Sequence, residues 1–153
     1  MRSRRTKDPQ EESVGAWAKR LYFASRVLMN GVLRSYGLGS TQWYVLHRLI
    51  KEGPTMQRDF VRLLQIERAT LSGIVSTLVR KGLIKQLPDP EDQRQRMLHL
   101  TDTGKKLWKK LPDPIALSQS IAFNGVDRRD LATASRVLQA ATERLNNHIL
   151  ERK

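Results

Sequence analysis

The sequence predicts a mainly α-helical protein that carries one small β-hairpin. Apolar residues recur at helical spacing in several stretches, and glycines or prolines separate these stretches. Two short apolar runs, residues 83–87 and 97–100, flank a charged segment that is rich in turn-forming residues. At 153 residues the chain has the length of one domain that can bury a core.

The segment 53–101 organises the rest of the chain, and its second predicted helix has two contrasting faces. The apolar face consists of Leu71, Ile74, Val75, Leu78 and Val79. The opposite face is small, polar and cationic, and consists of Arg68, Ser72, Gly73, Ser76 and Arg80. Such a face can enter a DNA groove about 12 Å wide and hydrogen-bond to base edges. An ordinary solvated helix would show the same pattern, so this helix alone leaves both interpretations open.

The residues that follow this helix favour the DNA-binding interpretation. Gly82 stands where a C-terminal glycine ends a helix. Residues 83–87 and 97–100 are predicted as paired strands, and the connecting residues 88–96 place prolines, aspartates and two arginines at the tip. A helix-turn-helix followed by a basic hairpin predicts a winged helix, in which one helix reads the major groove and the hairpin reaches sideways.

The first helix of this pair is predicted at about residues 56–64, with Thr55 as its N-cap. Its buried side is expected to consist of Phe60, Leu63 and Leu64. Arg58 and Arg62 are placed to contact backbone phosphate, which fixes the register on DNA without reading sequence.

Three further helical segments complete the prediction. Long helices are expected at about residues 13–36 and 127–150, the second with Asp127 as N-cap and apolar residues seven apart. A helix at 41–52 is expected to turn Trp43, Leu46, Leu49 and Ile50 inward. A helix capped by Thr101 is expected to break at 111–114, where Pro112 and Pro114 occur, and to resume at about 115–124.

Four motifs in this order resemble the MarR (multiple antibiotic resistance regulator) family. They are Ile66–Leu71, Leu78–Ile84, Pro88–Arg94 with its Asp-x-Arg at Asp92 and Arg94, and Leu98–Gly104 with its Leu-Thr-x-x-Gly. The resemblance extends more loosely to residues 37–43 and covers most of the chain. The chain departs from the family pattern at Pro112 and Pro114, because the connecting helix of the family is usually continuous.

The resemblance implies a dimeric winged-helix transcription factor. It implies a DNA-binding lobe at residues 40–111, dimerisation helices at 13–36 and 115–150, and a flexible basic tail at 1–12. The seven-residue apolar repeat of the last helix independently favours association with a second copy, although an intramolecular helix pair would also account for it. Repression is the more common effect in the family, so a homodimeric repressor on a near-palindromic operator is expected.

The DNA contacts are expected from three groups of residues. Base edges or nearby phosphates would be contacted by Arg68, Thr70, Ser72 and Ser76. In the wing, Arg94 would enter the flanking minor groove, Asp92 would hold that arginine by a charge-assisted hydrogen bond, and Arg96 would contact phosphate. Arg58 and Arg62 would contact phosphate from the preceding helix. The basic tail, with Arg2, Arg4, Arg5 and Lys7, would touch DNA or remain solvated.

The resemblance also implies a small effector, often aromatic or acidic, between the two lobes. Residues that could line its pocket are Trp17, Arg20, Tyr22, Arg26, Trp43, His47 and Trp108. Aromatic residues at helical spacing are more often core, so this set competes with a purely structural interpretation.

Composition and charge exclude several other classes. The formal net charge of +13 attracts polyanions or an anionic membrane surface. The chain has no cysteine, and its three histidines are scattered, so neither thiol chemistry nor a metal or other cofactor is expected. No grouping of nucleophile, base and carboxylates predicts an enzyme, and no apolar run predicts a membrane span or signal peptide, so the cytoplasm is expected. The alternative function is a winged-helix protein that coats DNA without sequence preference.

Overall fold

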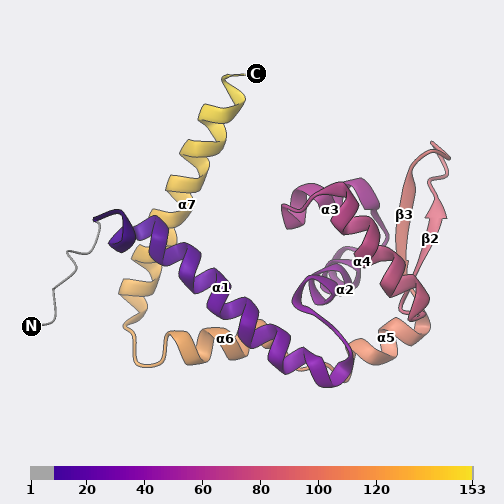
Figure 1. Cartoon of the computed structure of the whole chain (residues 1–153), viewed down its shortest axis with the longest axis horizontal. Coiled ribbons are helices and arrows are strands. Elements are labelled where there is room, and N and C mark those ends of the chain that lie inside the picture. The colour runs from indigo at the N-terminus through magenta and orange to yellow at the C-terminus, as the bar shows by residue number, and fades with distance from the viewer. Residues whose placement is uncertain (1–8, 153) are drawn as a thin grey trace, which may run out of the picture. The chain divides into compact units, whose positions relative to one another are not determined.

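Residues 9–152 are described by the computed structural model, so the predicted contacts of Arg2, Arg4, Arg5 and Lys7 lie outside the described residues. The described part is mainly helical with one small sheet, as predicted (Figure 1). Its elements are η1 (Pro9–Glu12), α1 (Val14–Leu33), η2 (Arg34–Tyr36), α2 (Ser40–Glu52), β1 (Thr55–Met56), α3 (Gln57–Leu64), α4 (Arg68–Arg80), β2 (Ile84–Pro88), β3 (Arg96–Leu100), α5 (Asp102–Trp108), α6 (Pro114–Ala122) and α7 (Arg128–Leu150). The chain divides into two compact units, the first ending at Ile115 and the second beginning at Ala116.

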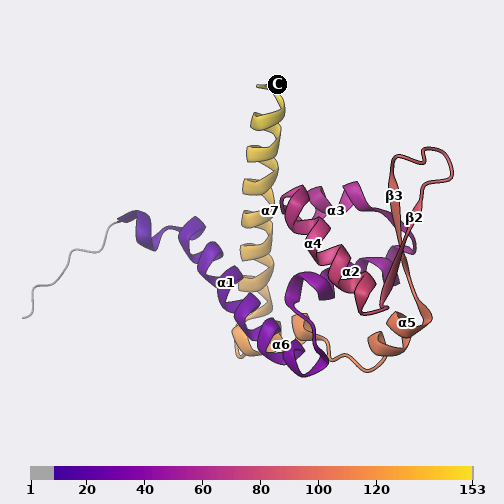
Figure 2. The same cartoon turned by 45° about the vertical axis from the view of Figure 1, so that its right-hand side comes forward.

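The core of the first unit lies between the C-terminal end of α1, α2, α3, α4 and the sheet. Its fully buried side chains come from every one of these elements, because each presents an apolar stripe to the others. They include Leu33, Leu46, Phe60, Leu71, Leu78, Ile84 and Leu98. Figure 2 shows α3 and α4 packed together and the β2–β3 hairpin projecting beyond them. This packing is the winged helix that the sequence predicts.

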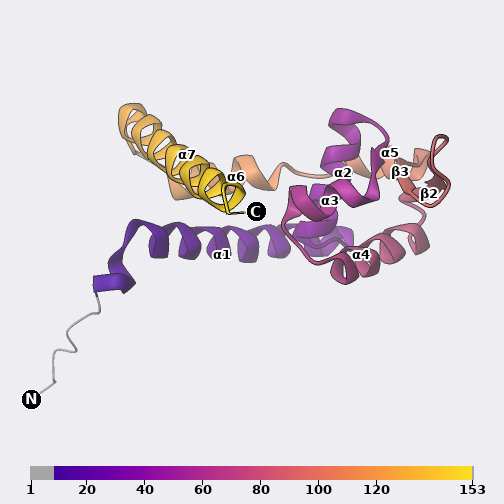
Figure 3. The ribbon, with the colours of Figure 1, turned by 90° about the horizontal axis from the view of Figure 1, so that it is seen from above.

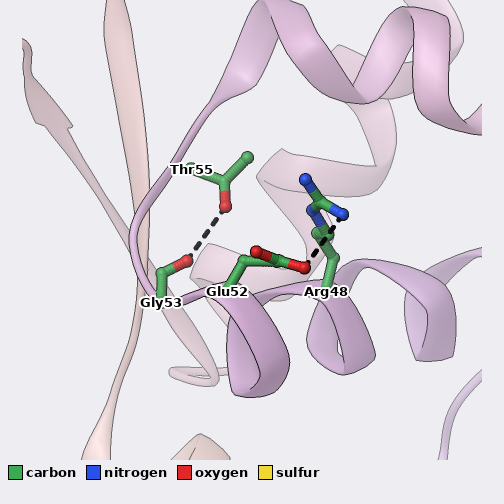
Figure 4. A network of polar contacts seen from close by, with 4 residues as sticks. All are labelled: Arg48, Glu52, Gly53 and Thr55. Atoms are coloured by element: carbon green, nitrogen blue, oxygen red, sulfur yellow. Dashed lines mark hydrogen bonds and ion pairs between the residues drawn. The ribbon is translucent and has the colours of Figure 1, made fainter.

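The sheet contains a strand that the sequence interpretation missed. Its order is β1–β3–β2, and all pairs are antiparallel. Leu98 at the centre of β3 pairs with Thr55 on one side and Gln86 on the other. Thr55 is therefore a strand residue and not the predicted N-cap of α3, whose N-cap is Met56. The Thr55 hydroxyl donates to the Gly53 carbonyl at 2.9 Å, directly after the end of α2, where Arg48 and Glu52 form an ion pair at 3.3 Å (Figure 4).

The turn after α4 confirms the role predicted for Gly82. Its φ of 73° lies in the left-handed region, which glycine adopts without a Cβ penalty. The Gly82 N–H donates to the Val79 carbonyl at 2.9 Å, and the Leu83 N–H donates to the Leu78 carbonyl at 3.0 Å. These two bonds satisfy the last carbonyls of the helix and turn the chain directly into β2.

The connecting segment begins and breaks as predicted. The Thr101 hydroxyl accepts from the Gly104 N–H at 3.0 Å and so caps α5. Helix α5 ends at Trp108, and α6 begins at Pro114, so the chain between them is not helical. Proline lacks a backbone donor, which explains why one continuous helix does not form here.

Three apolar residues that were predicted to be buried are substantially exposed. Val79 and Ile50 are each 40% exposed, and Leu63 is 45% exposed. Val79 and Leu63 stand at the edges of their apolar stripes, beyond the arc that the core covers. Ile50 lines an open pocket beside Trp108 instead of the core.

The long helices α1 and α7 leave much apolar surface uncovered within the single chain. Helix α1 buries Met29 and Leu33 near its C-terminal end, while its N-terminal half extends clear of the packed helices of the first unit (Figure 3). Trp17 in that half is 57% exposed. In the second unit, α7 begins at the predicted cap, where Asp127 accepts from the Arg129 N–H at 2.7 Å, and its Leu145 is 65% exposed.

Candidate nucleic-acid interface

Helix α4 presents the predicted polar face to solvent. Leu71, Val75 and Leu78 are buried, and this fixes the rotation of the helix about its axis. Arg68, Thr70, Ser72 and Ser76 are consequently exposed. The Ser72 hydroxyl donates to the Arg68 carbonyl at 3.0 Å. In this rotamer its outer lone pairs remain able to accept a hydrogen bond, for example from a base amino group.

A cleft of about 440 Å³ lies between α3, α4 and the wing. Four of the lining side chains are arginines, and none of the lining residues is acidic. The lining residues are Gln57, Arg58, Val61, Arg68, Leu71, Ser72, Gln86, Arg94, Gln95 and Arg96. Guanidinium groups bind phosphate with two parallel N–H donors, so this arginine-lined cleft is suited to a strand of nucleic acid. The structure thus brings together Arg58, Arg68, Ser72, Arg94 and Arg96 from the predicted site.

The wing tip is held by its own backbone and by Asp92. The Asp89 N–H donates to the Gln95 carbonyl at 3.0 Å, and the Gln95 N–H donates to the Asp92 carbonyl at 2.9 Å. The Asp92 carboxylate accepts from the backbone N–H of Arg94 at 3.0 Å. The sequence predicts a charge-assisted bond to the Arg94 side chain, whereas the bond that the structure shows is to the Arg94 backbone. Asp92 orients the tip, while the Arg94 side chain lines the cleft.

Three predicted contact residues do not line this cleft. Arg62 is exposed in the last turn of α3, and Thr70 and Ser76 are exposed on α4. Thr70 and Ser76 lie along the solvent face of α4 on either side of Ser72, where a bound duplex would extend beyond the cleft.

One polar contact in the cleft was not foreseen from the sequence. The side-chain amide of Gln86 on β2 donates to the side-chain carbonyl of Gln57 at 2.5 Å. Gln57 is the first residue of α3, so this bond joins the wing directly to the helix-turn-helix. The two residues are 29 positions apart, and only the strand register brings them together.

A second pocket, of about 550 Å³, lies beside α2 and α5 within the first unit. Three predicted effector residues meet there as a cluster of rings. The rings of Trp43 and His47 stack at 4.8 Å with 12° between their planes, and Trp108 lies 5.4 Å from Trp43. The complete lining is Trp43, His47, Ile50, Lys51, Trp108, Leu111, Pro112, Asp113 and Ile115.

The other four predicted effector residues lie on α1 and do not line this pocket. The Arg20 guanidinium lies over the Trp17 ring at 4.8 Å, and that of Arg26 lies over the Tyr22 ring at 5.7 Å. Each is a cation–π pair on one helix surface. The structure thus separates the predicted set into a ring cluster at α2 and α5 and two pairs on α1.

Two polar groups of the ring cluster are affected by burial, the imidazole of His47 and the indole N–H of Trp43. Burial is the first cause that lowers the pKa of His47, the Lys51 charge lowers that pKa further, and Asp113 opposes both. The imidazole is therefore neutral near pH 7. Among the residues that the structure describes, the buried indole N–H of Trp43 has no acceptor. A buried donor of this kind is usually satisfied by a bound molecule or water.

Between residues 9 and 152, no three His, Cys, Asp or Glu side chains are grouped as metal ligands would be. None of the helices in that range is both long and apolar enough to cross a membrane.

Comparison with known proteins supports one family. Residues 36–95 match the model of the MarR family. The chain is 31% identical over 103 residues to the transcriptional activatory protein BadR of Rhodopseudomonas palustris, covering 62% of this chain and 58% of that one. It is 29% identical over 96 residues to the transcriptional repressor NicR of Pseudomonas putida, covering 63% and 61%. The chain thus spans about three fifths of the length of these curated relatives.

The same family is found among solved structures. The PcaV transcriptional regulator of Streptomyces coelicolor, solved in complex with its natural ligand, superposes with a TM-score of 0.74. The two sequences are 26% identical, and the match covers 94% of this chain and 98% of the other. The segment that matches the family model, residues 36–95, contains the helix-turn-helix, β2 and the wing tip, and it ends just before β3. In its winged-helix fold and in residues 36–95, the chain is similar to the MarR family of transcriptional regulators.

Proposed function

We propose that this protein is a sequence-specific DNA-binding transcriptional regulator. Helix α4 would lie in the major groove, with Arg68, Thr70, Ser72 and Ser76 near base edges. Arg94 would enter the minor groove that flanks it. The observation that carries the proposal is the arginine-lined cleft, which joins α3, α4 and the wing around one cationic hollow. MarR proteins are regulators and not enzymes, which agrees with this proposal.

The regulator would act as a homodimer. The exposed apolar residues of α1 and those of α7 each form a surface that a second copy could cover; they include Val14, Trp17, Leu21, Val27, Leu145 and Ile149. A twofold dimer presents two copies of α4, so the operator would be a near-palindrome with half-sites about 10–10.5 base pairs apart. Such a protein works in the cytoplasm, where its DNA lies.

Repression is the effect that we propose, as in the relative named repressor NicR. The relative BadR is named as an activatory protein, so activation is the alternative. The position of the operator relative to the promoter decides between the two effects.

A fluorescence-anisotropy titration with the DNA upstream of the protein's own gene tests the proposal. Binding should survive excess random competitor, with a preference of about 10³-fold or more for the site at physiological salt. Binding that competitor removes entirely, at every upstream fragment tested and with a steep salt slope, would favour a protein that coats DNA without sequence preference.

Replacing Arg58 with glutamine should weaken binding to all sequences alike. Arg58 lines the cleft from α3, where its charge would contact the DNA backbone and not a base edge. Loss of one phosphate contact should reduce the slope of log Kd against log salt by about 1. Anisotropy at four salt concentrations measures this slope. Lys110→Gln removes the same charge outside the cleft, so an equal loss in both variants would contradict the assignment.

The finer part of the proposal is release of DNA by a small aromatic carboxylate in the ring cluster. Trp43 and Trp108 offer ring faces, and the Trp43 N–H and Lys51 offer donors. The ligand-bound PcaV structure supports a small-molecule site in this fold. Benzoate and nicotinate are suitable probes, and quenching of tryptophan fluorescence reports their binding.

Binding of benzoate to this pocket should strengthen as the pH falls. The pKa of His47 in the free protein is lowered below its usual value of about 6.5, and a bound carboxylate would raise it. Binding therefore takes up a proton between the lowered pKa of the free protein and the raised pKa of the complex, and the affinity rises as the pH falls through that interval. Fluorescence titrations across this range measure the effect. A His47→Gln variant should lose the pH dependence, and an unchanged dependence would show that another group titrates.

A further inference from the structure

The Gln57–Gln86 bond is the contact from which we infer a further function in DNA recognition. It is 2.5 Å long, and both residues line the arginine-lined cleft together with Arg58 and Arg94. Gln86 is exposed and Gln57 is half-buried. A solvent-accessible hydrogen bond between two side-chain amides contributes little to the free energy of unfolding. Because the bond lies in the cleft, its main effect would be to position neighbouring groups of the cleft and not to stabilise the fold.

The bond lies on a direct mechanical connection between α3 and the wing. Strand β1 ends at Met56, and α3 starts at the next residue, so the start of this helix is fixed to the sheet. Gln86 pairs across β3 through Leu98, which in turn pairs with Thr55 of β1. The hydrogen bond between the side-chain amides of Gln86 and Gln57 adds a connection on the cleft side of these paired residues. It ties the first turn of α3 to the strand that leads out to the wing tip.

The wing beyond this row is less supported. Hairpin pairing continues through Pro88 and Arg96 to the bond between Asp89 and Gln95, and then the tip turns back at Asp92. Any rotation of the hairpin about its base would move Arg94 by a larger distance than it moves Gln86. A contact near the base can therefore set the position of the guanidinium at the tip.

We propose that the Gln57–Gln86 pair is a positioning element that fixes Arg94 at one distance from α4. The wing would then read the base composition of the flank only at a set spacing from the major-groove site. This inference rests on the proposed function, since it concerns how the same cleft selects among DNA sites. It assigns Gln57 and Gln86 a role in specificity through Arg94 and no contact with DNA of their own.

The test begins with a duplex that the wild-type protein selects from a random pool. Two flanks are then compared under the wing, one rich in A·T and one rich in G·C, alongside a single mismatch in the core half-site. The wild-type protein should prefer the A·T flank by about tenfold. In Gln57→Ala, Gln86→Ala and the double variant this preference should fall to about twofold or less, while the core mismatch penalty is unchanged. The double variant should resemble each single variant, because both remove one shared bond.

Two further variants separate positioning from other causes. Arg94→Ala should abolish the flank preference, and its loss is the largest that the glutamine variants could produce through Arg94. Gln57→Glu keeps an acceptor for the Gln86 amide, so it should keep the flank preference even though its negative charge near Arg58 weakens binding overall. Thermal unfolding of each variant shows whether the fold is retained.

The possible failures can be told apart. If the random pool yields no preferred site, the proposed function itself fails. If the wild-type protein selects a site and the glutamine variants keep its flank preference, the positioning role is overturned. If these variants instead lose discrimination at the core mismatch, the amides contact bases directly, and the positioning role is again overturned.

Discussion

Replacing Arg94 with alanine is expected to weaken operator binding by about 10- to 100-fold. The side chain lines the arginine-lined cleft from the wing, opposite Arg58 on α3 and Arg68 on α4. A narrow minor groove concentrates negative potential, so a guanidinium held there gains more than one exposed to bulk solvent. The Asp92 carboxylate already fixes the backbone at this position at 3.0 Å. The arginine is therefore partly ordered before DNA binds, which lowers the entropy cost of binding.

Anisotropy at constant salt measures the loss, and Asp92→Asn provides a matched control in the same turn. Asparagine keeps an oxygen that can accept from the Arg94 N–H, and it removes one negative charge from the face near DNA. Asp92→Asn should therefore bind as well as the wild type or slightly better. Equal affinity of Arg94→Ala and the wild-type protein would remove the wing from the proposed interface.

The sequence predicts the helices and the wing well because each has strong local signals. Gly82 ends α4, Asp127 begins α7, and the prolines break the connecting helix, all as their local chemistry requires. The apolar face of α4 follows from its periodicity, and its polar face is exposed as a consequence. These features depend on residues within about one or two turns of one another.

The features that were missed depend on tertiary contacts. Thr55 has the chemistry of a helix cap, but pairing with β3 draws it into a strand of two residues, and so short a strand has no periodicity of its own. The exposure of Ile50 depends on where the chain runs after the break at Pro112, which local pattern does not specify. For the same reason the predicted effector residues could not be divided between α1 and the ring cluster.

The arginine-lined cleft contains both residues that the sequence predicts and residues that it does not. Arg94 and Arg96 follow from the composition of the hairpin tip, and Arg68 follows from the polar face of α4. Gln57 and Gln86 carry no signal, because a glutamine on a helix or on a strand is most often solvated. Their contact becomes evident only when the sheet register is known.

Replacing Gly104 with alanine is expected to destabilise the protein by about 3 kcal/mol, at the upper end of the usual cost of overpacking. A Cβ at this position would lie 2.2 Å from the Leu83 carbonyl oxygen and 2.8 Å from Cδ1 of Leu100. The Leu100 side chain can rotate, but the Leu83 carbonyl is backbone and accepts from the Thr101 N–H at 3.1 Å. Thr101 in turn donates through its hydroxyl to the Gly82 carbonyl at 2.6 Å.

The clash therefore cannot be relieved at one point. Moving α5 outward would strain the cap that Thr101 makes to Gly104 and would withdraw Leu107 and Trp108 from the core they pack against. Moving Leu83 would disturb the turn that ends α4. This interlocking explains why a Leu-Thr-x-x-Gly motif closes the wing: threonine binds both neighbouring segments, and only glycine leaves room for the carbonyl.

Thermal unfolding followed by circular dichroism measures the effect, which should lower Tm by about 6–12 °C. Gly73→Ala is the matched control, because a Cβ there meets nothing within 4 Å. Alanine in the middle of α4 should stabilise the helix by about 0.5–1 kcal/mol. Two glycines of one unit are thus expected to respond to the same substitution with opposite signs. A Gly104→Ala variant that melts at the same temperature as the wild-type protein would mean that α5 can shift away from Leu83 without loss of stability.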